Sequence, residues 1–100
     1  MRKALTSEEL TEALKSLPNW RHTDGKIVRD YAFPDFVAAM AFINQIATVA
    51  EEAGHHPDID IRYNKVRLGL VTHDSGGITA ADAKMAARID TVDPPHNSVL

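Results

Sequence analysis

Three of the five histidines in this 100-residue chain fall within a short stretch. His55 and His56 are adjacent and precede Pro57, and His73 follows 17 positions after His56. Imidazole titrates near neutral pH, so a group of histidines can offer one protonated and one neutral ring in the same pocket. These residue types therefore indicate a site that donates one proton and removes another.

Two carboxylates stand where they could serve such a site. Glu51 lies one helical turn before His55 and could orient an imidazole or hold a polar edge of a substrate. It shares the last turn of a predicted helix with Glu52, where negative charge opposes the helix dipole, and this favours a functional role for one of the pair. Asp82, in the first turn after a Thr79 cap, could serve helix capping, the site, or both.

Other chemistries fit the histidines less well. Three imidazoles could bind zinc, but the adjacent pair His55-His56 is awkward for ligation of one ion, so we expect no metal. The spacing alone also leaves open that the histidines are unrelated surface residues. The sequence has no hydroxyl-histidine-carboxylate order and no glycine-rich phosphate loop, so covalent hydrolysis and nucleotide chemistry have no support.

Composition limits the class of protein. With 44% hydrophobic residues and no long polar stretch, residues 1–92 suit a single compact domain, and the polar, proline-containing tail 93–100 is expected to be loosely ordered. The absence of cysteine excludes disulfides and thiolate metal sites and favours a reducing compartment. Polar residues soon after the start speak against a signal peptide, so we expect a cytoplasmic protein.

Charge and hydropathy exclude two kinds of partner. No stretch approaches the roughly 20 apolar residues of a membrane helix. The formal net charge of −3 at pH 7 provides no basic field for nucleic acid. A small molecule or another protein chain remains as the expected partner.

The first part of the chain predicts a helix and a hairpin. A capping box at Thr6 and Glu9 begins a helix over residues 7–17. The pair Asp24-Gly25 is a turn signal inside residues 20–33 and predicts two short antiparallel strands. Alternate positions of an extended strand share one face, and the expected core residues on that face are Ile27, Tyr31 and Phe33.

A long helix should come next, between Asp35 as its N-terminal cap and Gly54 as its C-terminal stop. Its residues span about 27 Å at roughly 1.5 Å each, enough to cross a small sheet. Steps of four and three predict a buried stripe made of Phe36, Met40, Ile43, Ala47 and Ala50.

Two more strands and a last helix complete the pattern. The strands are expected over residues 58–63 and 66–73, and the helix after Thr79. Alternation in the first of these strands predicts a core face made of Ile59, Ile61 and Tyr63. The order α-β-β-α-β-β-α fits an α+β fold in which helices pack on one face of an antiparallel sheet.

Several of these motifs together resemble the pterin-4a-carbinolamine dehydratase family. The similarity is densest between Glu51 and Asp82 and covers about nine tenths of the chain. The matching segments are Glu51, His55-His56-Pro57, Tyr63-Asn64-Lys65-Val66, Thr72-His73, Gly76-Gly77, and Thr79 with Asp82. The resemblance implies a four-stranded antiparallel sheet with three helices, in agreement with the element order.

The resemblance also implies a function. It would be the dehydration of a 4a-hydroxytetrahydropterin to the quinonoid dihydropterin, which recycles the pterin used by aromatic amino acid hydroxylases. His55 and His73 would act as acid and base, and His56 would bind and polarise the pterin. Substrate contacts would come from Glu51, Pro57, Thr72 and Asp82. The resemblance implies no cofactor and no metal. It does imply a homodimer or a homotetramer.

Two departures from the family pattern affect the pocket and not the core chemistry. Ala81 stands where an arginine is usual, and Ile59 where an aromatic residue often follows the His-His-Pro segment. The alternative function is a protein-binding, dimerisation or assembly module, because the family fold also serves in such roles. The retention of His55, His56 and His73 favours the enzyme.

Overall fold

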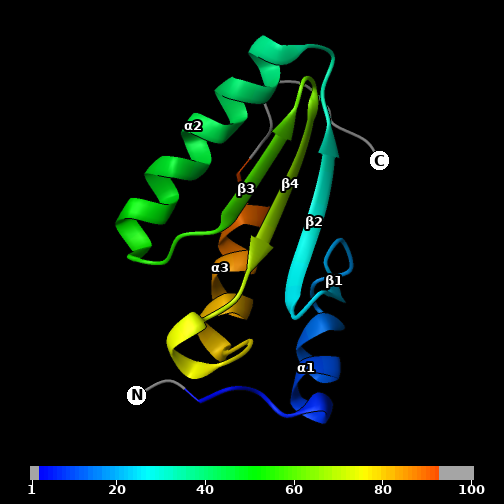
Figure 1. Ribbon diagram of the computed structural model, residues 1–100, viewed down its shortest axis with the longest axis vertical. Helices are drawn as coiled ribbons and strands as arrows, with labels where there is room; N and C mark the ends of the chain where they lie inside the picture. Colours follow the sequence, from blue (N-terminus) through cyan, green and yellow to red (C-terminus); the bar gives the residue numbers. More distant parts are fainter. Residues whose placement is uncertain (1–2, 93–100) are drawn as a thin grey trace.

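The computed structural model describes residues 3–92, so the predicted loosely ordered tail lies outside the described part (Figure 1). Within this range a four-stranded antiparallel sheet and three helices follow the predicted order α-β-β-α-β-β-α. The strands lie in the spatial order β1-β2-β4-β3. Their bounds are β1 Arg21–Thr23, β2 Lys26–Ala32, β3 Asp58–Arg62 and β4 Lys65–Leu70.

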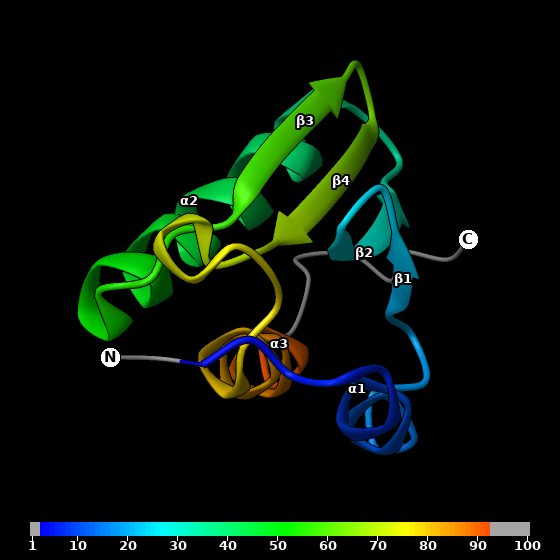
Figure 2. The same ribbon diagram turned by 60° about the horizontal axis from the view of Figure 1, so that its bottom comes forward.

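Three helices cover one face of this sheet, as expected (Figures 1 and 2). Figure 2 shows β3 and β4 in front of the long helix α2. Between β4 and α3 the chain makes a short 3-10 turn, η1. The helical bounds are α1 Ser7–Leu14, α2 Phe36–Ala53, η1 His73–Ser75 and α3 Ala80–Asp90.

The first hairpin forms where its turn signal predicted it. Asp24 and Gly25 both have positive φ, 53° and 76°, which is the turn geometry that matches the twist of two paired strands. Thr23 consequently pairs with Lys26. The expected core residues of this hairpin and its extension, Ile27, Tyr31 and Phe33, are all buried.

Helix α2 has the predicted ends but not the predicted buried stripe. The Asp35 carboxylate accepts a hydrogen bond from the Ala38 backbone at 2.8 Å, and Gly54 ends the helix at φ 65°. Phe36 is 48% exposed and Ala47 is also exposed. Apolar residues lie on nearly every side of this helix, so spacing alone could not select the inner face. The buried residues are Ala38, Ala39, Phe42, Ile46 and Ala50.

Two strands end earlier than predicted. Tyr63, expected in the core, is 66% exposed because the chain leaves β3 at Arg62 and turns at Tyr63 with φ 55°. Ile59 is 41% exposed, since β3 is an edge strand of the sheet that residues 3–92 form. The chain also leaves β4 at Leu70, which places His73 in η1 and not in a strand.

Helix α1 is shorter than predicted. It ends at Leu14, and the next residues continue with i to i−3 hydrogen bonds, such as Leu17 N–H to the Leu14 carbonyl at 3.0 Å. This tighter winding still buries Leu17 in the core. The N-terminal segment then lies against the start of α3, where Leu5 N–H donates to the Ile78 carbonyl at 2.7 Å.

Candidate active site

The β3–β4 pairing brings the predicted site segments to one end of the sheet. Asp58 at the start of β3 pairs with Gly69 near the end of β4. His55 and His56 directly precede β3, and His73 follows β4. Because antiparallel partners run in opposite directions, the chain enters β3 and leaves β4 at the same end.

A helix-to-strand corner positions His55. Gly54 adopts the left-handed conformation at φ 65°, which a glycine reaches without steric cost. The His55 backbone N–H then donates to the Ala50 carbonyl at 3.2 Å. The corner turns the His55 side chain inward toward α3, and that side chain is only 11% exposed.

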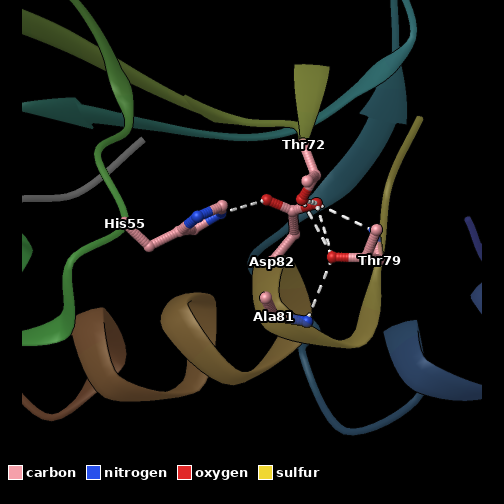
Figure 3. A network of polar contacts seen from close by, with 5 residues as sticks. All are labelled: His55, Thr72, Thr79, Ala81 and Asp82. Atoms are coloured by element: carbon pink, nitrogen blue, oxygen red, sulfur yellow. Dashed lines mark hydrogen bonds and ion pairs between the residues drawn. The ribbon is translucent and has the colours of Figure 1, made fainter. Parts of the chain in front are cut away.

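The Asp82 carboxylate is fully buried and joins three segments of the chain (Figure 3). Its Oδ2 accepts hydrogen bonds from the Thr79 backbone N–H and from the Thr72 hydroxyl, both at 2.8 Å. Its Oδ1 lies 2.5 Å from Nε2 of His55. The capping contact and a contact with His55 therefore coexist on one carboxylate, with one oxygen for each.

The threonine hydroxyls complete the hydrogen bonding around Asp82. A carboxylate only accepts, so Thr72 donates its hydroxyl proton to Asp82. The Thr72 oxygen lies 2.9 Å from the Thr79 hydroxyl and accepts the proton of that group. The Thr79 oxygen accepts in turn from the Ala81 backbone N–H at 3.2 Å. Each polar atom in this buried network has a partner, which fixes the position of Oδ1.

This network determines how His55 can act. Because Oδ1 of Asp82 accepts, Nε2 of His55 carries the donated proton, and Nδ1 accepts when the ring is neutral. Within residues 3–92 no side chain or backbone group hydrogen-bonds Nδ1. His55 can therefore remove a proton through Nδ1 or, once protonated, return one through the same atom.

A cavity of about 350 Å³ opens beside His55. This volume lies at the small end of the range for small-molecule sites, about 300 to 1,000 Å³. The remaining lining comes from the end of α2 and from one side of α3: Ala53, Ala81, Lys84, Met85 and Arg88. Lys84 and Arg88 were not among the predicted site residues, although their four-residue spacing on a helix signals a shared face.

His56 lies in a different environment from His55. Its Nε2 is 2.5 Å from Oε2 of Glu51, but the two side chains are 60% and 77% exposed. The predicted contact of Glu51 with an imidazole is therefore to His56, across the helix end. Pro57, partly buried, leads the chain from this pair into β3.

His73 lies outside the hydrogen-bond network of Asp82. It directly follows Thr72, which is 7% exposed and part of the Asp82 network, whereas His73 itself is exposed. Its imidazole has no hydrogen bond or ion pair with another described residue. In the described range no three histidine, aspartate or glutamate side chains gather closely enough to hold a metal ion. The same residues include no helix long and apolar enough to cross a membrane.

Known proteins resemble this chain along most of its length. The family model described as pterin 4 alpha carbinolamine dehydratase matches residues 3–92. A protein of Acidobacterium capsulatum named "Putative pterin-4-alpha-carbinolamine dehydratase" is 57% identical over 88% of this chain and 96% of its own length. A crystal structure from Brucella melitensis titled transcriptional coactivator/pterin dehydratase is 40% identical, with a TM-score of 0.81, covering 88% of this chain and 96% of that one.

A more distant structure shares the fold with a different role. It is titled a pterin dehydratase-like protein identified as a RuBisCO assembly factor in the alpha-carboxysome. It is 26% identical to this chain, with a TM-score of 0.56, and the similarity covers 71% of this chain and 82% of that one. The match over residues 3–92 and the 57% identity to a curated relative show that this chain belongs to the pterin 4 alpha carbinolamine dehydratase family.

Proposed function

We propose that this chain dehydrates 4a-hydroxytetrahydropterin to the quinonoid dihydropterin, and so recycles the pterin of an aromatic amino acid hydroxylase in the cytoplasm. The observation that carries the proposal is the buried contact of 2.5 Å between Nε2 of His55 and Asp82, beside a cavity that His55 lines. Family membership supports the substrate class.

The reaction requires two proton movements. The hydroxyl on C4a leaves as water after it accepts a proton, N5 loses its proton, and a double bond forms between N5 and C4a. In the proposal Nδ1 of His55 handles one of these protons, since Asp82 occupies Nε2. His73 handles the other, and its exposed ring can exchange protons with solvent. These steps need no metal or cofactor.

The remaining predicted residues hold the substrate or the acid-base pair. We assign His56, paired with Glu51, to binding and polarising the pterin. Pro57 fixes the direction of the chain beside that pair, because its ring locks φ. Thr72 and Asp82 act mainly by holding the ring of His55.

The test is a direct assay of dehydration. A hydroxylase generates the carbinolamine, and the quinonoid product is followed by its absorbance with and without this protein. The wild-type protein should accelerate product formation, and His55→Gln should lower kcat by about 100-fold, the size of a lost general acid or base. Decay that is unchanged by the wild-type protein anywhere between about pH 6 and about pH 8 would reject the proposal.

A protein-binding role is the second candidate, and the apolar surface at the far end of the molecule favours it. Phe36 and Val37 begin α2 and are 48% and 74% exposed, and Tyr63 in the β3–β4 turn is 66% exposed. A hydrogen bond of 2.8 Å from the Asn64 side chain to the Phe33 carbonyl joins the two segments. Val37→Asp should abolish an assembly function while dehydration continues. Loss of dehydration alone would argue against a binding surface that is separate from the dehydration site.

We also propose that the chain forms homodimers or homotetramers. The same exposed apolar residues and the open edge of β3 support self-association. Sedimentation equilibrium should give a mass of two or four chains. A monomer mass at all protein concentrations up to about 100 μM would exclude oligomers with a dissociation constant below about 100 μM.

A further inference from the structure

We propose that the cavity beside His55 selects pterins whose C6 substituent carries an anionic group such as a phosphate ester, and that Lys84 is the residue that selects them. This inference rests on the proposed function, because it assumes that the reacting end of a pterin lies at His55. It adds the class of side chain that the substrate carries.

The charges that line the cavity have one sign. Lys84 and Arg88 both contribute to its wall, and no carboxylate does. Arg88 is already paired with Glu52 of α2. Lys84 has no hydrogen bond or ion pair with any other residue in the range 3–92, so its positive charge is uncompensated. An anion that entered the cavity would meet this charge without displacing a protein carboxylate.

Helix geometry aims both cations at the same place. Ala81, Lys84, Met85 and Arg88 stand at i, i+3, i+4 and i+7 on α3, which is one face of a helix. Met85 is 3% exposed and supplies an apolar wall. Ala81 carries only a methyl group, so no long side chain of that residue enters the cavity that His55 and Lys84 also line.

The position of C6 in the ring links the reaction to Lys84. C6 is bonded to N5, the atom that loses its proton, so a substituent on C6 starts one bond from the reacting centre. With that centre at His55, the substituent is within the same cavity whose wall includes Lys84. Lysine binds phosphate as a point charge at the end of a flexible stem. A neutral hydroxylated substituent would gain little from this charge, whereas a phosphate would form an ion pair with it.

Three other hollows lined by residues in the range 3–92 lack this feature, because each has at least one carboxylate in its wall. One of about 480 Å³ lies on the outer face of the sheet, lined by Asp30, Asp60, Arg62, Lys65 and Arg67 among others. There, Arg67 pairs with Asp30 at 2.7 Å and Arg62 with Asp60 at 3.3 Å. Acidic and basic groups therefore share that surface, and an incoming anion would meet carboxylates as well as cations.

The test compares two substrates that differ only in the C6 side chain, one ending in a phosphate ester and one in a hydroxyl. The measured quantity is the ratio of their kcat/KM values, which cancels general effects on the chemistry. Lys84→Gln should lower this ratio by about fivefold, the size of one partly exposed charge pair, and Lys84→Glu should lower it further. Lys65→Gln, on the outer face of the sheet, is the matched control and should leave the ratio unchanged.

Ionic strength provides a second readout, since added salt should lower kcat/KM for the phosphate substrate more than for the hydroxyl one. Equal ratios in wild type, Lys84→Gln and Lys65→Gln, with both substrates turned over, would overturn the inference and leave the dehydratase function intact. If the wild-type protein turns over neither substrate, the dehydratase proposal fails. Calorimetry with a stable 7,8-dihydropterin phosphate then decides: weaker binding by Lys84→Gln supports the charge selection, and equal binding contradicts it.

Discussion

Two adjacent histidines make the same kind of contact in opposite environments. His55 and His56 each place Nε2 2.5 Å from a carboxylate oxygen, of Asp82 and Glu51 respectively. The buried pair is 11% and 0% exposed, the surface pair 60% and 77%. A surface pair exchanges with water and contributes little, whereas a buried carboxylate with several donors holds its partner in one orientation. The contact distance alone therefore does not distinguish the two histidines; the burial of each pair does.

The largest effect should come from removing the buried charge. Asp82→Asn replaces one accepting oxygen by an NH2 group, so the Thr72 and Thr79 donors and His55 compete for a single acceptor. We expect a loss of about 3 kcal/mol in the free energy of unfolding, as for a broken buried pair. Urea denaturation measures it. A loss below about 1 kcal/mol would mean that this network does not hold the site together.

A smaller loss should follow from removing one hydroxyl of the network. Thr72→Val keeps the shape but leaves Asp82 and Thr79 each short of one partner. The expected cost is about 1.5 kcal/mol in the free energy of unfolding. Thr11→Val, which removes an exposed hydroxyl bond to Ser7 on α1, is the control and should cost under about 0.5 kcal/mol. Equal costs at both positions would contradict the difference between buried and exposed contacts.

The ion pairs of Asp30 with Arg67 and Arg21 have intermediate exposure. The pH dependence of the free energy of unfolding tests what they contribute. The hydrogen bond from Arg67, followed by the contacts with Arg21, holds the pKa of Asp30 below its ordinary value of 3.8 despite partial burial. A lowered pKa in the folded state means that stabilisation is complete above the unfolded value and disappears as pH falls through the folded one. Wild type should exceed Asp30→Asn by about 1 kcal/mol in the free energy of unfolding at pH 7.

This difference should shrink below about pH 4, as the Asp30 carboxylate becomes protonated. Chemical denaturation at several pH values measures it. Asp60→Asn is the control, because Asp60 is 54% exposed and has one contact of 3.3 Å with Arg62. A difference between wild type and Asp30→Asn that stays constant or grows toward acid would show that the two arginine contacts do not stabilise the fold.

The smallest effect on stability is expected at the surface pair. Glu51→Gln removes a charge that faces His56 in solvent, and the free energy of unfolding should change by less than about 0.5 kcal/mol. Any loss of activity in this variant would then reflect contact with the pterin and not a weakened fold. A stability loss comparable with that of Asp82→Asn would show that exposure does not separate the two pairs.

Local signals predicted the elements well. The turn at Asp24-Gly25, the Asp35 and Gly54 ends of α2 and the Thr79 cap of α3 depend on residues close in sequence, and each formed as expected. The inner face of α2 could not be predicted, because the helix is apolar on most sides and the sheet selects Phe42 against Tyr31. The hairpin end at Tyr63 is set by the turn geometry and not by the alternation that precedes it.

The members of the His55–Asp82 contact were singled out from the sequence, but their contact was not. The Thr79 cap drew attention to Asp82, and the His-His-Pro segment to His55. Their contact spans 27 positions and depends on how α3 packs beside the α2–β3 corner. The sequence also could not show that His55 is buried while His56 is exposed, since adjacent residues at a corner have no periodicity to separate them.

The central claim is that buried Asp82 holds the ring of His55 in one protonation form, whereas exposed Glu51 does not do so for His56. The position of the ring proton on the two histidines tests this claim most directly. A two-bond proton–nitrogen NMR spectrum recorded near pH 8.5, where imidazoles are largely neutral, distinguishes Nε2–H from Nδ1–H rings. His55 should show a single Nε2–H form that becomes mixed in Asp82→Asn, and His56 should show a mixture in both proteins. An Nδ1–H ring at His55, or the same mixture at both residues, would contradict the account.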